Sequence, residues 1–164
     1  MTFKMYAQER ISNFFSYGEA TYVDKRLGID NTPTDDHLAN LIFLCKEIAD
    51  PCRELVGGPL HGYFYRSPAL NSITPGADPN SQHMIGQAVD LDCDKYGIGT
   101  NKQVFNYIRT KLVFDIMIWE FGTTDNPDWV HVSVRTPQYG PNRHFVKRAY
   151  RDEKGTHYIP FDLT

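Results

Sequence analysis

The sequence predicts an α+β domain in which a small antiparallel sheet carries helices packed on one side and a site on its polar face. Three observations predict this architecture. The chain has 164 residues, a length that suits one hydrophobic core and a single domain spanning 1–164. Apolar residues recur at helical spacing in two segments, and short alternating segments follow each of them. Turn-forming residues separate the later alternating segments, as expected for antiparallel neighbours.

The first predicted helix follows an N-terminal segment, 1–33, that is expected to wrap on the core as a short element. Thr34 is a good N-cap, and acidic residues fill the turn after it. Apolar residues at helical spacing continue to Cys52, with Pro51 expected to kink or restart the helix. A short strand is predicted next, over 60–66.

The middle of the chain is predicted to hold a long loop, a strand and a second helix. The loop covers 67–82, which is rich in Ser, Pro, Asn and Gly, and loops of this length are often functional. Residues 88–93 alternate as a strand, with Asp90 and Asp92 on one face. Thr100 is expected to cap the second helix.

Two antiparallel strands are predicted over 113–121 and 129–134, joined by turn-forming residues. The remaining tail, 136–164, is predicted to hold a structural hairpin, with strands at 145–150 and 156–161, or a substrate-facing flap. A cluster of basic residues in this tail is interpreted as a solvated face because acidic residues are interspersed. Its members are Arg143, His144, Lys147, Arg148 and Arg151.

Composition excludes several classes of partner. The formal net charge of −3 provides no global attraction to phosphate, so we expect no nucleic-acid partner. No apolar run reaches the roughly 18 residues that a membrane span needs, so no membrane insertion is expected. Residues 1–10 lack the apolar core of a signal peptide, which predicts a chain that is cytoplasmic as synthesised. We expect a monomer.

The three cysteines are Cys45, Cys52 and Cys93, an odd number without CxxC spacing. This pattern favours neither a disulfide framework nor a thiolate metal cluster. We therefore expect buried, reduced, structural cysteines.

Three residues predict a metal site. A catalytic zinc takes three protein ligands of nitrogen or oxygen type and keeps one position open for water. His83 precedes Gly86, which permits a tight turn, Asp90 follows on a strand, and His131 lies on a later strand. Asp128, three residues before His131, is placed to exchange a proton with the water.

The two segments that carry these residues are Ser81-Gln82-His83-Met84-Ile85-Gly86-Gln87-Ala88-Val89-Asp90 and Asp128-Trp129-Val130-His131-Val132-Ser133. They resemble the zinc-dependent D-Ala-D-Ala carboxypeptidases and phage L-alanyl-D-glutamate endolysins, which have the Hedgehog/DD-peptidase fold, and in particular their small phage and prophage members. The resemblance covers about residues 10–135, and the tail beyond Arg135 matches no assigned part of that family.

The resemblance implies one bound zinc ion (Zn2+), with His83, Asp90 and His131 as ligands and Asp128 as the general base. Some members of the family use Glu as the base, so Glu120 is a rival for a supporting or even the primary role.

The resemblance also implies residues that bind substrate. Arg66, within Tyr65-Arg66-Ser67, would hold a substrate carbonyl or carboxylate, with Ser81 as its partner. Gln87 and Trp129 are further candidates. Gln87 or Ser133 is alternatively expected to tune the metal, and an aromatic residue on a strand, such as Trp129, is more often part of the core.

The function implied is hydrolysis of bonds next to D-amino acids in peptidoglycan stem peptides, by a zinc-activated water. Whether the enzyme is a carboxypeptidase or an endopeptidase is left open, because loop lengths do not decide between a closed pocket and an open groove. A cytoplasmic chain would need lysis or export to reach the cell wall. The alternative is a non-catalytic zinc-binding module of the same fold, for protein interaction or as a phage structural component.

Overall fold

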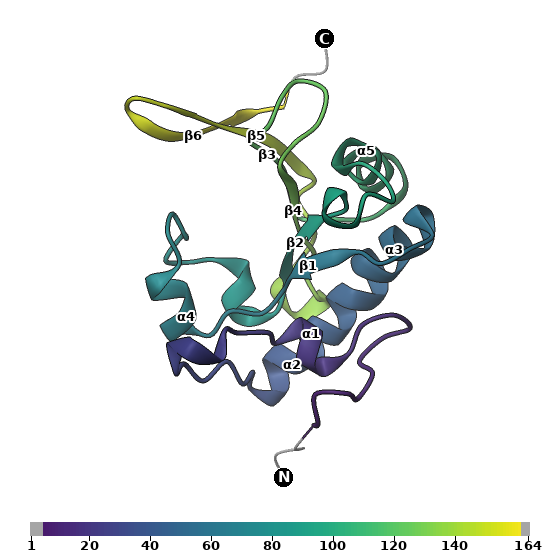
Figure 1. The fold of residues 1–164 in the computed structure, drawn as a ribbon, viewed down its shortest axis with the longest axis vertical. Helices are drawn as coiled ribbons and strands as arrows, with labels where there is room; N and C mark the ends of the chain where they lie inside the picture. Colours follow the sequence, from purple (N-terminus) through teal and green to yellow (C-terminus); the bar gives the residue numbers. More distant parts are fainter. Residues whose placement is uncertain (1–4, 162–164) are drawn as a thin grey trace.

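The computed structural model describes residues 5–161, so the first four residues of the segment used to judge a signal peptide lie outside the described part. Its central feature is one six-stranded sheet, which Figure 1 shows nearly edge-on. The strand order across the sheet is β1-β2-β4-β3-β5-β6. The strands are β1 His61–Tyr63, β2 Ala88–Asp92, β3 Ile116–Glu120, β4 Trp129–Ser133, β5 Phe145–Asp152 and β6 Gly155–Pro160.

Four of the five strand pairings are antiparallel, but β3 and β5 are parallel, so the expectation of a wholly antiparallel sheet was wrong at one pairing. The path of the chain explains the difference. β4 already occupies one edge of β3 and ends beside the start of β3, where Met117 pairs with Val132. The chain then enters the free edge of β3 from that same end, with Phe145 opposite Ile116. A strand that enters there must run parallel to β3.

The helix predicted from Thr34 is present, and its N-cap is confirmed: the Thr34 side chain accepts a hydrogen bond from the backbone of His37. The helical segment consists of α2 Asp35–Leu44, a π-helical turn Cys45–Ala49 and α3 Asp50–Val56. The wide turn directly precedes Pro51, which has no N–H to donate and whose ring crowds the preceding turn of an α-helix. The proline therefore alters the helix without ending it.

The second predicted helix is α5 Asn101–Lys111, and the Thr100 side chain caps it by accepting from Gln103 N. α2, α3 and α5 lie on one side of the sheet, whereas the short helix α4 Pro68–Ile73 lies on the other side (Figure 1). The helical side holds one continuous hydrophobic core, to which the sheet contributes Val89, Leu91, Met117, Trp119, Val130 and Val132.

Helix α4 corrects the prediction of a structureless loop over 67–82. Ser67 caps this helix by accepting a hydrogen bond from Leu70 N, and Pro68 occupies its first turn. Both residues favour the start of a helix. The segment was nevertheless predicted as a loop because it is rich in loop-forming residues. The other short elements are α1 Tyr17–Ala20 and the 3₁₀ turns η1 Lys25–Leu27, η3 Gln82–Ile85, η4 Asp94–Tyr96 and η5 Pro137–Tyr139.

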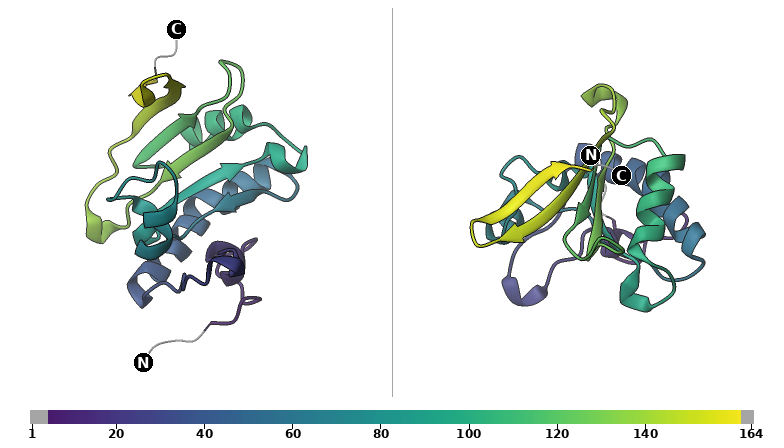
Figure 2. Two further views of the ribbon diagram at one scale, coloured as in Figure 1. Left: turned by 60° about the vertical axis from the view of Figure 1, so that its left-hand side comes forward. Right: turned by 90° about the horizontal axis from the view of Figure 1, so that it is seen from above.

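The predicted C-terminal hairpin is present as β5 and β6, which pair from Lys147 opposite Pro160 to Asp152 opposite Gly155. It projects from the sheet on the side opposite α5, as the end-on view in Figure 2 shows. The expected state of the cysteines is also confirmed: all three are free and buried. Among the described residues, no helix has the length and apolar character that crossing a bilayer requires.

Candidate metal centre

The structure brings the three predicted ligands together on the open face of the sheet. Asp90 on β2 and His131 on β4 are directly opposite each other in the antiparallel register, which places their side chains on the same face. His131 Nδ1 lies 2.9 Å from Asp90 Oδ1, and His83 Nε2 lies 3.3 Å from Asp90 Oδ2. One ligand atom from each residue lies within 4.8 Å of those of the other two.

His83 is held in place by its surroundings. It lies in η3, which Ser81 caps and Gly86 ends with a left-handed backbone at φ +73°. A Cβ at position 86 would come within 2.3 Å of the carbonyl oxygen of His37 on α2, so only glycine fits this close approach. The His83 Nδ1–H donates to the carbonyl oxygen of Phe64 at 2.6 Å. That bond assigns the tautomer and leaves the Nε2 lone pair directed at Asp90.

The chemistry of these three residues fits a divalent metal ion. His83 is 1% exposed, and its Nε2 forms no hydrogen bond with any described residue despite its burial. An unpartnered buried nitrogen is costly unless a ligand takes its lone pair. Burial lowers the pKa of His83 and outweighs the opposing effect of Asp90, so the imidazole is neutral, as a metal ligand must be. The group could therefore hold a metal ion.

Asp90 supplies the negative charge of the group. Burial by itself raises the pKa of its carboxyl, but the two neighbouring imidazoles, with the hydrogen bond from His131, hold that pKa well below its usual range. The carboxylate is therefore ionised. Two imidazoles and one carboxylate form a three-ligand set, and three-ligand sets are typical of catalytic zinc sites that leave one position open.

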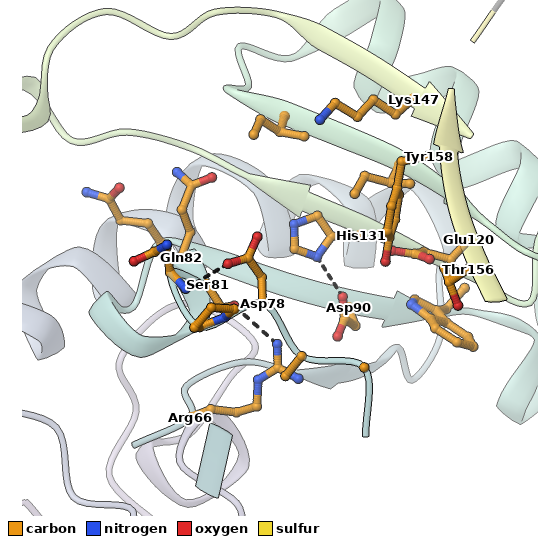
Figure 3. Close-up of a pocket in the computed structure, with 18 of the residues that line it drawn as sticks. Arg66, Asp78, Ser81, Gln82, Asp90, Glu120, His131, Lys147, Thr156 and Tyr158 are labelled. Atoms are coloured by element: carbon orange, nitrogen blue, oxygen red, sulfur yellow. Dashed lines mark hydrogen bonds and ion pairs between the residues drawn. The ribbon is translucent and has the colours of Figure 1, made fainter. Parts of the chain in front are cut away.

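Asp90 and His131 border a cavity of about 720 Å³. Figure 3 shows Asp90 and His131 between Arg66 on one side and Glu120 and Tyr158 on the other. A second cavity, of about 430 Å³, lies over β1 and shares Arg66, Asp90 and Trp129 with the first. Asp90 of the metal group therefore borders both cavities.

Glu120, predicted as a rival base, lies inside the main cavity. It is 7% exposed and lies on β3, two residues after Ile118 and on the same face of the sheet. Ile118 is the residue opposite His131. Burial raises the pKa of Glu120 to about 7, and nearby Asp90 adds to the rise, whereas His131 and Arg151 oppose it. A carboxyl with a pKa near neutrality both accepts and returns a proton readily at neutral pH.

Asp128, the predicted base, lies elsewhere. Its side chain is exposed, and it lines neither of the two cavities. Its backbone N–H donates to the carbonyl oxygen of Glu120, and its own carbonyl accepts from Asn101 Nδ2. These contacts close the turn between β3 and β4. Of the two carboxyl residues predicted as possible bases, Glu120 lines the main cavity and Asp128 does not.

Arg66 and Ser81 are adjacent, as predicted for a substrate-binding pair. Arg66 Nη2 donates to Ser81 Oγ at 3.3 Å, and both residues line the main cavity. Asn31 holds the backbone here, because its amide accepts from Ser67 N at 2.6 Å and donates to the carbonyl oxygen of Tyr65 at 3.0 Å. Burial lowers the pKa of Arg66 and Asp90 opposes that effect, but the guanidinium stays charged near neutral pH.

The two further substrate-binding candidates differ in exposure. Trp129 is half-buried and borders both cavities beside the metal group. Gln87 touches the main cavity but is 1% exposed, and its amide donates to Thr136, which in turn donates to Asn40. Gln87 is therefore part of a buried polar chain that ties the start of β2 to α2.

Several residues that line the cavity were not predicted from the sequence. They come from the segment after β4 and from the hairpin, and they are Arg135, Tyr139, Arg143, Lys147, Arg151, Thr156 and Tyr158. The sequence feature that could have indicated these residues is the basic cluster of the tail, which we interpreted as a solvated face. Part of that cluster faces the metal group because β5 pairs with β3.

Asp115 anchors this segment. Its carboxylate is fully buried and accepts two hydrogen bonds from the Arg143 guanidinium, at 2.9 and 2.6 Å, with Arg135 Nε at 3.2 Å. Gln82 Nε2 donates to the same carboxylate at 3.1 Å, which links this anchor to η3 and hence to His83. Burial raises the pKa of Asp115, but the two arginines outweigh it and lower the pKa overall.

Comparison with known proteins identifies no relative: no family model matches the chain, and no curated protein is significantly similar to it.

Proposed function

We propose that this protein is a zinc-dependent peptidase that cleaves peptidoglycan stem peptides next to D-amino acids, with the Hedgehog/DD-peptidase fold that the sequence resemblance implies. One observation carries the proposal. A neutral histidine with an unpartnered buried nitrogen, an ionised aspartate and a second histidine converge at the floor of a cavity that also holds a carboxyl group with a pKa near 7. Metal ligands combined with a separate proton-transfer group are the parts that metal-assisted hydrolysis requires.

The metal ligands would be His83 Nε2, one carboxylate oxygen of Asp90 and His131 Nδ1, which would release the proton that it donates to Asp90. Zinc suits this set because it accepts nitrogen and carboxylate ligands and, when bound, activates water and polarises a carbonyl group. The hydrogen bond from His83 to the Phe64 carbonyl is the kind of outer contact that orients a metal-binding imidazole.

Glu120 is our choice for the proton acceptor, in place of Asp128. Its carboxylate would take the proton from the attacking water and return it to the amine that leaves as the peptide bond breaks. The choice rests on position and environment, since Glu120 is buried in the cavity and Asp128 is exposed outside it. Arg66 would donate hydrogen bonds to the carbonyl oxygen as negative charge develops on it.

The shape of the site favours cleavage within a peptide over removal of a terminal residue. The two cavities share Arg66, Asp90 and Trp129 as lining residues, so a peptide bound across Asp90 would have space on both sides of it. A carboxypeptidase would instead need the space beyond the scissile bond to be closed. We therefore favour an endopeptidase.

The test is hydrolysis of purified peptidoglycan by the zinc-loaded wild type, Glu120→Gln and Asp128→Asn, with metal content measured and products identified by mass. We expect Glu120→Gln to keep one zinc and lose about 10²–10⁴-fold in rate, as for removal of a general base. Asp128→Asn should stay within about threefold of the wild type.

The reverse result for these two variants would reassign the base to Asp128. Zinc bound by all three proteins without cleavage by any of them would overturn the peptidase and favour the non-catalytic module.

A further inference from the structure

The hairpin β5–β6 forms one wall of the main cavity and brings cations toward the metal group. Lys147 on β5 is opposite Ile118 on β3, and Ile118 is opposite His131 on β4. These residues share a face, so the Cα atom of Lys147 stands two strand spacings, roughly 10 Å, from that of His131. Figure 3 shows Lys147 and Tyr158 on the same side of the sheet as His131 and Asp90.

Most cations that line this cavity already have partners. Arg135 and Arg143 share the buried carboxylate of Asp115, and Arg66 donates to Ser81. The Arg151 guanidinium lies 4.1 Å from the centre of the Phe121 ring, which leaves its charge unneutralised. Lys147 is half-buried, yet its ammonium forms no hydrogen bond or ion pair within residues 5–161. Its charge is therefore available to a ligand in the cavity.

The other end of the groove has the opposite character. The cavity over β1 is lined by Tyr22 and Tyr63 and by four carboxyl residues, which are Glu19, Asp24, Asp92 and the shared Asp90. Among the described residues that line it, the shared Arg66 is the only base. An anionic group on the substrate would be repelled at this end and attracted toward the hairpin. The difference in charge between the two cavities would therefore favour one orientation of an anionic substrate in the groove.

We propose that Lys147, with Arg151 beside it, forms a subsite for a substrate carboxylate that lies within about two residues of the scissile bond, so that the protein selects acidic peptides. This inference rests on the proposed function, because it concerns the same cavity. A lysine reaches about 6 Å from its Cα atom, so a carboxylate a residue or two from the metal group comes within ion-pairing distance. Stem peptides offer two such groups, the α-carboxylate of D-glutamate and the C-terminal carboxylate.

The test is a comparison of charged and amidated peptides. A synthetic stem pentapeptide would be used in three forms: with both carboxylates free, with the D-glutamate α-carboxylate amidated, and with the C-terminus amidated. Binding would be measured calorimetrically to the zinc-loaded Glu120→Gln protein, alone and combined with Lys147→Gln or Lys154→Gln. Lys154 is the matched control, because it lies exposed at the tip of the same hairpin and lines neither cavity.

We expect Lys147→Gln to weaken binding of the free peptide by about 10-fold, as for loss of a charge-assisted hydrogen bond. The same substitution should change binding of one amidated peptide by less than about twofold, and that peptide identifies the carboxylate that is bound. Lys154→Gln should leave all three affinities unchanged. Equal weakening of every peptide by Lys147→Gln, or no weakening, would overturn the subsite.

Cleavage of the same peptides by the protein with Glu120 intact separates this inference from the proposed function. Cleavage without any preference for the free carboxylates would leave the peptidase standing and remove the subsite. A Lys147-dependent preference in binding without cleavage of any peptide would support the subsite and overturn the peptidase. Failure of all three peptides to bind would overturn the subsite.

Discussion

The two faces of the central sheet are built from the same strands but differ in what their side chains do. On the helix-covered face, Val89, Leu91, Met117, Val130 and Val132 are fully buried in the hydrophobic core. On the open face, the residues that alternate with them line a cavity and include Asp90, His131, Glu120 and Lys147. Because side chains alternate along a strand, every second position contributes to stability and the positions between them to the site. Substitutions on the helix-covered face should therefore mainly affect stability, and substitutions on the open face should mainly affect function.

The largest effect is expected from Leu91→Ala on the core face. Leu91 is fully buried between Asp90 and Asp92, and its truncation should lower the free energy of unfolding by about 2–5 kcal/mol through lost burial and a residual cavity. Urea denaturation measures this loss. Ile118→Ala, on the half-buried open face, is the matched control and should cost less. Equal losses at the two positions would break the distinction between the faces.

The next effect concerns pH and Glu120 in the metal-free protein. Its carboxyl, faced by His131, Asp90, Arg151 and Tyr158, has its pKa raised from 4.5 to about 7 by burial. The folded state therefore holds this proton more tightly than the unfolded state does. The contribution to stability is present below about pH 4.5 and is lost as pH rises toward 7, in total on the order of 3 kcal/mol.

Denaturation of the wild type and Glu120→Gln at several pH values between 4.5 and 8 tests this prediction. Because Gln does not titrate, the wild type should lose stability relative to the variant as pH rises through this window. A difference that is independent of pH would show that Glu120 titrates at its ordinary pKa.

A slightly smaller effect on the free energy of unfolding is expected from binding of the metal ion. Zinc at about 100 times its dissociation constant should raise the free energy of unfolding by about 2.7 kcal/mol, because it binds the folded state. Asp90→Asn removes the charged ligand and should abolish this stabilisation while leaving the metal-free protein folded. Thermal unfolding with and without zinc measures it. Asp92→Asn, two residues along the same strand, is the control and should keep the full zinc effect.

The smallest effect is expected from Lys147→Gln, which should change the free energy of unfolding by less than about 0.5 kcal/mol, as for surface substitutions without partners. Urea denaturation would show this directly. A loss above about 1 kcal/mol would indicate that Lys147 supports the hairpin and would place it with the structural residues.

The three residues that could hold a metal ion were predicted from two short sequence segments, within which their placement is local. The Gly86 turn and the strand alternation at Asp90 are local, and pairing of two neighbouring strands supplies His131. Spacing along the chain favoured Asp128, three residues before His131, as the base, whereas the carboxyl group that lines the main cavity, Glu120, is placed there by pairing between strands. Glu120 is near the site because β3 pairs with β4 in a particular register.

By itself, the sequence determined the main helices and strands, the caps at Thr34 and Thr100, the buried cysteines and the three residues that could hold a metal ion. Tertiary structure alone decided that β5 adds to β3 in parallel, that a helix forms within the long loop, and that Glu120, Lys147 and Tyr158 face the metal group. The physical reason is the range of the interactions. Capping and alternation act over a few residues, whereas strand order and burial depend on contacts between segments far apart in the chain, which no local pattern records.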